Sequence, residues 1–196
     1  MKRIFDFIFS LFGLLILSPF LLVIAFLIKK EDRGPVFYRG ERVGLHGKLF
    51  RIFKFRTMVV DAEKMGPSST SEEDPRITQV GRWIRRHKVD ELPQLLNVFL
   101  GDMSFVGPRP QVRWAVALYT PEEKNILTVR PGITDYASLR FSNEAEILKG
   151  AEDPDKAYLE LIHPEKTRLA LQYVRNHSLL IDLKLIILTI RQVLMG

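Results

Sequence analysis

The stretch FIFSLFGLLILSPFLLVIAFLI, residues 7–28, decides the fold because it contains no charged side chain. It is roughly 22 residues long, which is enough for a helix to cross a bilayer core of about 30 Å. A signal peptide would have a shorter apolar region followed by a small-residue cleavage site, whereas residues 29–32 are all charged. A buried helix in a soluble protein would rarely stay uncharged over this length. The stretch therefore predicts a membrane helix.

Ser18 and Pro19 lie at the centre of this stretch and predict a bend. Proline lacks a backbone N–H and its ring clashes with the preceding turn, and the Ser18 hydroxyl could bond a carbonyl that the bend frees. Cytoplasmic flanks attract Lys and Arg, so two basic flanks favour a helix–break–helix that enters and leaves through the same leaflet. Prolines also occur in true spanning helices, so both topologies stay open. The basic flanking residues are Lys2, Arg3, Lys29, Lys30 and Arg33.

The composition of the chain restricts its class and its partners. A length of 196 residues suits one domain, or one domain plus an anchor. The absence of cysteine excludes disulfides, thiolate nucleophiles and Cys-based zinc sites, and it allows a cytoplasmic setting. A net charge of +6 favours an anionic partner, such as nucleic acid, a phosphate-rich substrate or an acidic membrane surface. A modest excess of Lys and Arg that only aids solubility is the alternative.

After the apolar stretch, glycines punctuate short apolar runs and predict a small β-hairpin between residues 31 and 58. Basic and aromatic residues alternate from Phe50 to Arg56. This alternation fits a half-buried strand with a solvated basic face. It fits equally a strand that delivers Lys54 and Arg56 to an anion.

Most of the remaining chain has helical patterns, so we expect an α+β protein that is mostly helical. A turn region is expected from Gly101 to Pro110, and Thr120 resembles a helix cap. The segment from Ser178 to Leu194 is too polar to span a membrane, and it suits a core helix or an amphipathic helix at the interface. Helices are expected over residues 77–87, 90–100 and 111–119, after residue 120, twice more before His177, and over 178–194.

Several common catalytic motifs are absent from the sequence. There is no phosphate-binding P-loop, Rossmann glycine fingerprint, nucleophile elbow or His-Glu-x-x-His zinc helix, and the four histidines are scattered. Asp153-Pro154-Asp155 matches the short carboxylate motif with which many glycosyltransferases bind a metal and a nucleotide. Acidic loops are common, so this match is weak.

The strongest cluster of chemical groups is Arg85-Arg86-His87-Lys88-Val89-Asp90-Glu91-Leu92-Pro93-Gln94. Adjacent carboxylates point in different directions at a helix start, so they can divide the chemistry between them. An Asp carboxylate is a known nucleophile toward phosphorus, and Mg²⁺ commonly binds one or two carboxylates together with substrate phosphates. Asp-Glu before a helix is also explained by ordinary complementation of the helix dipole, and spacing alone favours this explanation.

Cations near this pair fit a phosphate-containing substrate. Arg85 and its basic neighbours precede the pair in the sequence. Arg109 lies between two prolines, which hold its backbone stiffly, and a guanidinium suits bidentate phosphate contact.

The order and identity of these motifs closely resemble the bacterial sugar transferase family, the monotopic phosphoglycosyl transferases, in its minimal single-domain form. Each motif alone is weak, but together they span nearly the whole chain and are highly specific. The matching stretches are Ser18-Pro19, Lys54-Phe55-Arg56-Thr57-Met58, Arg85, Asp90-Glu91-Leu92-Pro93-Gln94, Asn97-Val98, Gly101-Asp102-Met103-Ser104-Phe105-Val106-Gly107-Pro108-Arg109-Pro110, Arg130-Pro131-Gly132-Ile133-Thr134 and Asp182-Leu183-Lys184.

The resemblance implies an enzyme that moves a sugar-1-phosphate from a UDP-sugar to polyprenyl (undecaprenyl) phosphate and releases UMP. It implies that Asp90 is a covalent nucleophile and Glu91 a Mg²⁺ ligand. It further implies that Arg85 and Arg109 bind phosphate, and that Lys54 and Asp182 support the active site. This would be the first membrane step of glycoconjugate or polysaccharide biosynthesis, with membrane lipids as partners and no nucleic acid.

The resemblance also implies where the chain resides. Residues 1–30 would form a re-entrant membrane helix broken at Ser18-Pro19. Residues 31–196 would form a cytoplasmic catalytic domain, with interfacial amphipathic helices around the active site. The protein would be monotopic, on the cytoplasmic face of the bacterial inner membrane.

The sequence departs from the commonest family pattern after Thr134, where Asp135 to Leu139 replaces the usual Gly-Leu-Ala-Gln-Val. This region and the acidic stretch after it, up to Glu165, are where we expect discrimination between sugars to arise. Arg140 is a candidate contact to the sugar or the nucleotide. Two other classes stay in view: a membrane-anchored module that only binds lipid phosphates, and a metal-dependent glycosyltransferase that releases UDP.

Overall fold

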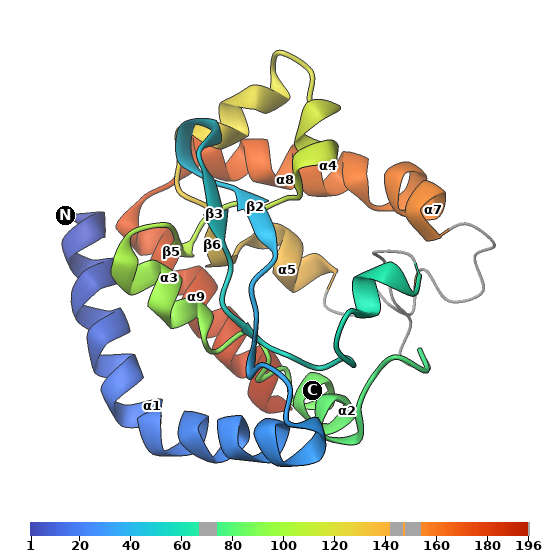
Figure 1. Cartoon of the computed structure of the whole chain (residues 1–196). Coiled ribbons are helices and arrows are strands. Elements are labelled where there is room, and N and C mark those ends of the chain that lie inside the picture. The colour runs from blue at the N-terminus through green and yellow to red at the C-terminus, as the bar shows by residue number, and fades with distance from the viewer. Residues whose placement is uncertain (67–73, 142–146, 148–153, 196) are drawn as a thin grey trace.

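The structure is a computed structural model and describes residues 1–66, 74–141, 147 and 154–195 (Figure 1). In this part of the chain most residues are helical, and the strands form three two-stranded sheets. The expected mostly helical α+β fold is therefore confirmed.

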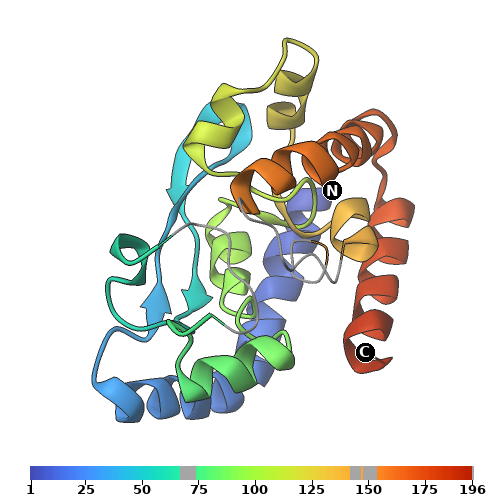
Figure 2. The same cartoon turned by 90° about the vertical axis from the view of Figure 1, so that its right-hand side faces the viewer.

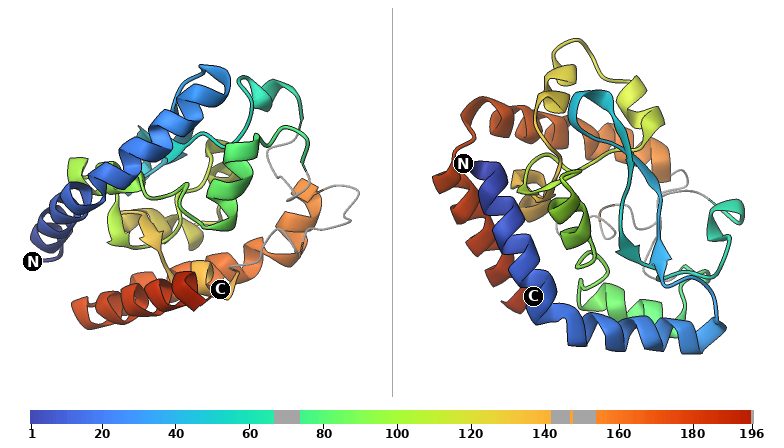
Figure 3. Two further views of the ribbon diagram at one scale, coloured as in Figure 1. Left: turned by 90° about the horizontal axis from the view of Figure 1, so that it is seen from below. Right: turned by 60° about the vertical axis from the view of Figure 1, so that its left-hand side comes forward.

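The apolar stretch forms α1 (Lys2–Asp32), a single long helix that bends sharply near its midpoint (Figures 1 and 3). Pro19 is inside this helix, and the Ser18 hydroxyl donates a 2.8 Å hydrogen bond to the carbonyl of Leu15. Leu15 is four residues before Pro19, so its carbonyl is the one that the missing proline N–H leaves without a helical partner. The predicted bend is confirmed, but the chain stays helical through it, so α1 is one bent helix rather than two separated helices.

Most of the surface of α1 is apolar and exposed. By length and composition alone it is the one helix among the described residues that could cross a membrane. Its buried residues are few and include Ile24 and Ile28 in the C-terminal half. Its exposed large apolar residues include Ile4, Ile8, Phe12, Leu15, Ile16, Leu22, Val23 and Phe26.

The predicted hairpin is confirmed as two consecutive antiparallel pairs of strands. β1 (Phe37–Tyr38) pairs with β4 (Lys54–Phe55), and β2 (Glu41–Val43) pairs with β3 (Leu49–Arg51). The ladder continues between the pairs, because the Ile52 N–H donates to the Gly40 carbonyl at 3.0 Å. The tip is formed by η1 (Leu45–Gly47), where Gly47 adopts a positive φ of 76°.

The region from Gly101 to Pro110 is not only a turn, as the sequence suggested. It contains β5 (Ser104–Val106), which pairs in parallel with β6 (Gly132–Thr134). Close backbone approach at the ends of these strands requires glycine: a Cβ on Gly107 would lie 2.3 Å from the Arg130 carbonyl oxygen. This pairing joins positions far apart in the sequence, and local patterns do not reveal it.

The expected helices are present, with shifted ends. The helix expected from Asp90 begins only at Gln94, because residues 90–93 form a turn. Thr120 and Glu123 cap each other reciprocally at the start of a 3₁₀ helix. The helices are α2 (Gln79–Arg86), α3 (Gln94–Leu100), α4 (Arg113–Ala117), α5 (Tyr136–Arg140), α7 (Pro154–Leu161), α8 (His163–Asn176) and α9 (Leu179–Met195), with the 3₁₀ helices η2 (Ala62–Lys64) and η3 (Glu123–Thr128).

The helices pack around the hairpin and the parallel pair. α3 packs along α1, and α2 lies near the C-terminal half of α1 in both Figure 1 and Figure 2. On α9, Leu185 is buried, whereas Leu180, Ile187 and Ile190 are exposed. α9 thus has the apolar outer face expected of an interfacial helix, and its location at a membrane stays a prediction.

Candidate active site

Asp90 and Glu91 lie in the turn between α2 and α3. The turn is fixed to the hairpin because the Phe55 N–H donates to the Asp90 carbonyl at 2.9 Å. It is fixed to α3 because the Gln94 N–H donates to the Glu91 carbonyl at 2.9 Å. Backbone bonds on both sides therefore set the position of the two carboxylates.

Lys54 on β4 points at both carboxylates. Its Nζ lies 2.5 Å from Glu91 Oε1 and 3.9 Å from Asp90 Oδ2. The side chains of Asp90 and Glu91 are each 22% exposed, so a ligand can reach them. The sequence left open whether this strand delivers Lys54 and Arg56 to an anion. Lys54 does meet carboxylates of the site, while the buried Arg56 instead forms a bidentate ion pair with Asp32 at the end of α1.

Arg109 binds Glu91 through both of its terminal nitrogens. Arg109 lies in the loop after β5, between Pro108 and Pro110. Its backbone N–H donates to the buried Asp135 at 3.3 Å. Asp135 also caps α5 by accepting from the Ser138 N–H. Asp135 was seen in the sequence only as part of a departure from the family pattern, and its position directly after β6 explains why it meets Arg109.

Arg85, in the last turn of α2, approaches the same turn from another side. Its Nε donates to the Thr57 hydroxyl at 2.9 Å, and its charge acts on Asp90. Gly81 allows α2 to pack closely here, because a Cβ on it would lie 2.0 Å from the Thr57 carbonyl oxygen. The structure thus brings Arg85, Lys54 and Arg109 together around the two carboxylates.

The two carboxylates have opposite electrostatic environments. Burial raises the pKa of Asp90 and the Glu91 charge adds to this, although Lys54, Arg109 and Arg85 oppose the shift. Burial would also raise the pKa of Glu91, but the charges and hydrogen bonds of Arg109 and Lys54 outweigh it and hold that pKa well below its usual range. Glu91 is therefore the fully paired carboxylate.

Among the described residues, the Asp90 carboxylate has fewer and longer contacts than that of Glu91. Within residues 1–66, 74–141 and 154–195, its carboxylate accepts no hydrogen bond, and Lys54 is the only cation within 4.0 Å of it. A carboxylate that is positioned by its backbone and bordered by cations, but is itself unbonded, suits a nucleophile toward phosphorus.

Glu91 could hold a Mg²⁺ ion that is shared with a substrate, rather than one held by protein side chains alone. Among the described residues no group of three or more His, Asp or Glu side chains is placed to hold a metal. Two adjacent carboxylates match the one or two that Mg²⁺ takes when phosphates and water complete its shell. Glu91 would have to share its oxygens with Lys54 and Arg109.

Two sequence-predicted residues lie outside this cluster. Asp182 on α9 is 2% exposed, binds Lys2 of α1 and accepts from the Tyr173 hydroxyl at 2.7 Å. Arg140 is exposed at the end of α5. Their predicted roles in the site stay predictions. Asp153 and the side chain of Asp155 lie outside the described residues.

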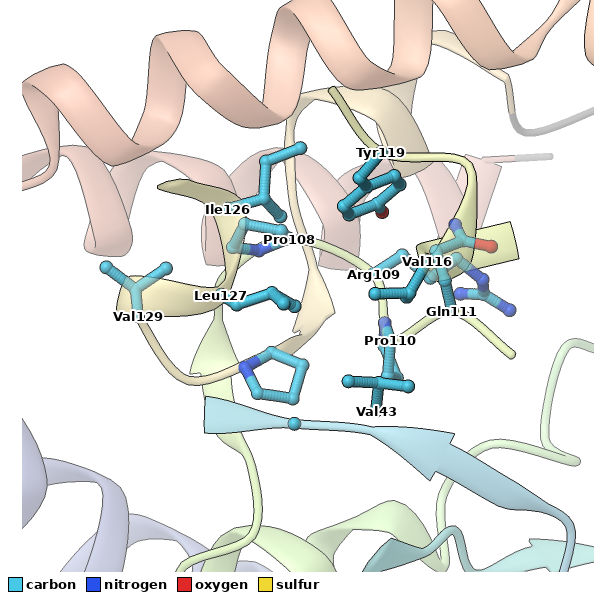
Figure 4. A pocket seen from close by; sticks show the side chains of 12 residues that line it. Val43, Pro108, Arg109, Pro110, Gln111, Val116, Tyr119, Ile126, Leu127 and Val129 are labelled. Carbon is cyan, nitrogen blue, oxygen red and sulfur yellow. The ribbon is translucent and has the colours of Figure 1, made fainter. Parts of the chain in front are cut away.

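Arg109 also borders two small adjoining cavities behind the site. One is lined mainly by apolar residues, and Figure 4 shows the Arg109 guanidinium and the Gln111 amide on one side of it, opposite Leu127 and Val129. The second extends past Asp135 to Lys166 and Thr167 of α8. Residues of η3 and α8 thus line the cavities on the other side from the Arg109 loop.

Comparisons with known proteins identify the family of this chain. The bacterial sugar transferase family model matches residues 1–196. The chain is 42% identical to the exopolysaccharide production protein PSS of Rhizobium leguminosarum bv. phaseoli, over 97% of this chain and 93% of that protein. It is 38% identical to the undecaprenyl-phosphate glucose phosphotransferase of Komagataeibacter xylinus, over 97% of this chain and 35% of that protein.

A third relative is the UDP-glucose:undecaprenyl-phosphate glucose-1-phosphate transferase of Escherichia coli (strain K12). The identity is 34%, over 97% of this chain and 39% of that protein. The chain thus covers nearly all of the Rhizobium protein and little more than a third of the other two. On the match over its full length, the chain belongs to the bacterial sugar transferase family.

Proposed function

We propose that this protein transfers a sugar-1-phosphate from a UDP-sugar to polyprenyl phosphate at a membrane, as an early step of polysaccharide biosynthesis. The observation that carries the proposal is the unequal pair: Glu91 is bound by Lys54 and Arg109, whereas Asp90 is partly exposed and accepts no hydrogen bond from the described residues. The names of two of the three relatives, which specify undecaprenyl phosphate and a glucose phosphotransferase or glucose-1-phosphate transferase, support the same reaction class.

In the first half-reaction, a carboxylate oxygen of Asp90 attacks the sugar-linked phosphorus of the UDP-sugar. A bond forms between Asp90 and that phosphorus, the bond to the bridging oxygen breaks, and UMP leaves with the bond electrons. The protein then holds the phosphosugar as an acyl phosphate on Asp90. Attack requires the ionised carboxylate, which Lys54, Arg109 and Arg85 favour against the effect of burial.

We propose that three cations stabilise the negative charge that develops during this step. Lys54, Arg85 and Arg109 approach the carboxylate turn from β4, α2 and the loop after β5. Cations fixed in advance around a transferring phosphoryl group stabilise its transition state without reorganising. The guanidinium fork of Arg109 would exchange Glu91 for phosphate oxygens when a donor binds. Glu91 would hold Mg²⁺ with the donor phosphates, and the ion would offset their charge.

In the second half-reaction, an oxygen of polyprenyl phosphate attacks the same phosphorus. The bond to Asp90 breaks, the carboxylate is restored and a polyprenyl diphosphosugar is released. The exposed apolar surface of α1 suits a protein whose acceptor is a lipid.

We further infer that α1 enters the membrane from the cytoplasmic side, bends at Ser18 and Pro19 and returns. The bend, the basic residues at both ends and the exposed apolar surface support this monotopic topology. Accessibility tags at Met1 and at Gly196 should then both be cytoplasmic in cells. A periplasmic tag at Met1 would contradict the topology.

The identity of the leaving nucleotide tests the proposed reaction. The full chain in nanodiscs is incubated with Mg²⁺, polyprenyl phosphate and a panel of UDP-sugars, and the nucleotide products are separated. UMP formation is the expected result. UDP formation would indicate transfer of the sugar without its phosphate, and absence of turnover with the whole panel would contradict an enzymatic role.

A further inference from the structure

The turn that carries Asp90 and Glu91 joins two short helices whose outer ends both contact α1. α2 leads into the turn and α3 leads out of it. The outer ends are the N-terminus of α2 and the C-terminus of α3, which present unpaired N–H and C=O groups. Each of these ends receives a charged side chain from a different end of α1.

Glu31, in the last turn of α1, caps the N-terminus of α2. Its Oε1 accepts hydrogen bonds from the backbone N–H groups of Gln79 at 2.8 Å and Val80 at 3.3 Å. The Thr78 side chain caps the same helix by accepting from the Gly81 N–H at 2.9 Å. A negative charge at a helix N-terminus also interacts favourably with the helix dipole.

Arg3, in the first turn of α1, caps the C-terminus of α3. Its guanidinium donates to the carbonyl of Val98 at 2.5 Å and to that of Phe99 at 2.7 Å. Gly101 leaves room for this contact, because a Cβ there would lie 3.0 Å from an Arg3 nitrogen. A positive charge at a helix C-terminus is the favourable counterpart of the Glu31 contact.

Apolar contacts reinforce both ends of the arrangement. In the N-terminal half of α1, the rings of Phe7 and Phe99 stack with centroids 5.0 Å apart. In the C-terminal half, Ile28 belongs to a buried cluster with Phe55 and Ile84, which are the immediate neighbours of Lys54 and Arg85. The N-terminal half of the bent helix therefore contacts α3, which follows the carboxylate turn, and its C-terminal half contacts β4 and α2, which carry Lys54 and Arg85 (Figure 3).

We propose that α1 fixes the position of the turn that carries Asp90, in addition to anchoring the chain in the membrane. Arg3 and Glu31 are the positioning residues. The bend at Ser18 and Pro19 sets the separation of the two ends of α1. The two capping contacts transmit this separation to the outer ends of α2 and α3, and so to the turn with Asp90. The activity readout of this inference rests on the proposed function, while its structural readout does not.

The test compares Arg3→Ala, Glu31→Ala and their double variant with Lys30→Ala, in full-length protein reconstituted in nanodiscs. Lys30 is a matched control because it is a charged, exposed neighbour of Glu31 for which the described residues provide no side-chain hydrogen bond or ion pair. Two quantities are measured: the rate of phosphosugar attachment to the protein, and amide hydrogen exchange in residues 87–93, with α8 as the internal reference. Glu31→Gln, which keeps an acceptor oxygen, serves as the conservative variant.

In the double variant we expect the maximal attachment rate to fall about 10-fold to 100-fold, because small misplacement of a reacting group has effects of this size. The KM for the donor should change less, exchange in 87–93 should rise while α8 stays protected, and Glu31→Gln should recover part of the rate. An unchanged rate and unchanged exchange in the variants would overturn the positioning role of α1. Exchange that rises equally in α8 would also overturn it, because it indicates global destabilisation. If the wild type itself attaches no phosphosugar, the proposed function fails, and the exchange measurement still decides whether α1 positions the turn.

Discussion

Two clusters in this protein each combine a lysine with an aspartate, and they differ in what the aspartate can do. At the α2–α3 turn, Asp90 lies 3.9 Å from Lys54, is 22% exposed and accepts no hydrogen bond from the described residues. Between α1 and α9, Asp182 is 2% exposed, binds Lys2 and accepts from Tyr173. Burial raises the pKa of Tyr173, so its hydroxyl stays protonated and keeps donating to Asp182.

By our proposal, this difference separates a carboxylate that reacts from one that holds two helices together, and the predicted role of Asp182 in the site stays a prediction. Among the described residues, Lys2 compensates the charge of Asp182 and Tyr173 donates to it, so Asp182 links α9 to α1 and α8. At the other cluster Glu91 forms the short ion pairs with Lys54 and Arg109, and we propose that Asp90 meets the phosphate of the donor. Sequence motifs marked both aspartates as site residues, and only the contacts distinguish them.

The largest effect is expected for Asp90→Asn. The amide cannot form the acyl phosphate, so attachment of label from a UDP-sugar with a labelled β-phosphate should fall on the order of 10⁴-fold or more, as for other removed nucleophiles. Gel autoradiography of purified protein measures this. Persistent labelling would remove Asp90 from the nucleophile role and erase the contrast with Asp182.

A smaller effect is expected for Arg109→Lys. The substitution keeps the charge but loses the fork that spans Glu91 and, by our proposal, phosphate oxygens. We expect a loss of about 10²-fold in kcat/KM, which is typical of removing one charge-stabilising donor. Lys48→Arg on the hairpin tip is the control and should behave as wild type. Equal activity of Arg109→Lys and wild type would mean that the fork is not used.

The pH dependence of labelling tests how the neighbouring charges shift the pKa of Asp90. Only the carboxylate form of Asp90 attacks, so the rate should fall as the pH drops through its raised pKa. Lys54 lowers this pKa, so Lys54→Met should move the acidic limb to higher pH. Glu91 raises it, so Glu91→Gln should move the limb to lower pH. Stopped-time labelling from low to neutral pH measures both shifts, and shifts with the opposite signs would refute the assignment.

The smallest effect on labelling is expected for Asp182→Asn. Removing the charge weakens the contacts with Lys2 and Tyr173, which should lower the free energy of unfolding by about 1.5–3 kcal/mol. Per folded molecule, labelling should stay close to wild type. Thermal unfolding together with labelling well below the transition temperature separates the two quantities. A folded variant with abolished labelling would place Asp182 in the catalytic machinery after all.

Local patterns were sufficient for the features that depend on neighbouring residues. The Ser18-Pro19 bend, the glycine-punctuated hairpin and the Thr120 cap follow from proline geometry, strand alternation and capping preferences. The Asp90–Glu91 pair could be located, although spacing alone favoured the ordinary reading and the family resemblance was needed to choose the catalytic one.

The features that the sequence did not reveal all depend on contacts between distant segments. The β5–β6 pairing depends on residues 104 and 132 meeting, and no local periodicity records this. One of the two readings of the sequence had Arg56 bind an anion, but its partner is Asp32 at the end of α1. Asp135 could be recognised as a support for Arg109 only once β6 placed it beside β5.

The most direct test of the central claim is peptide mass mapping of the wild-type protein after incubation with a UDP-sugar and Mg²⁺ without the lipid acceptor. Our account predicts a mass increase equal to one phosphosugar on Asp90, with release of UMP, and loss of this adduct when polyprenyl phosphate is added. An adduct on another residue, or turnover to the lipid product without any protein adduct under rapid quenching, would contradict it.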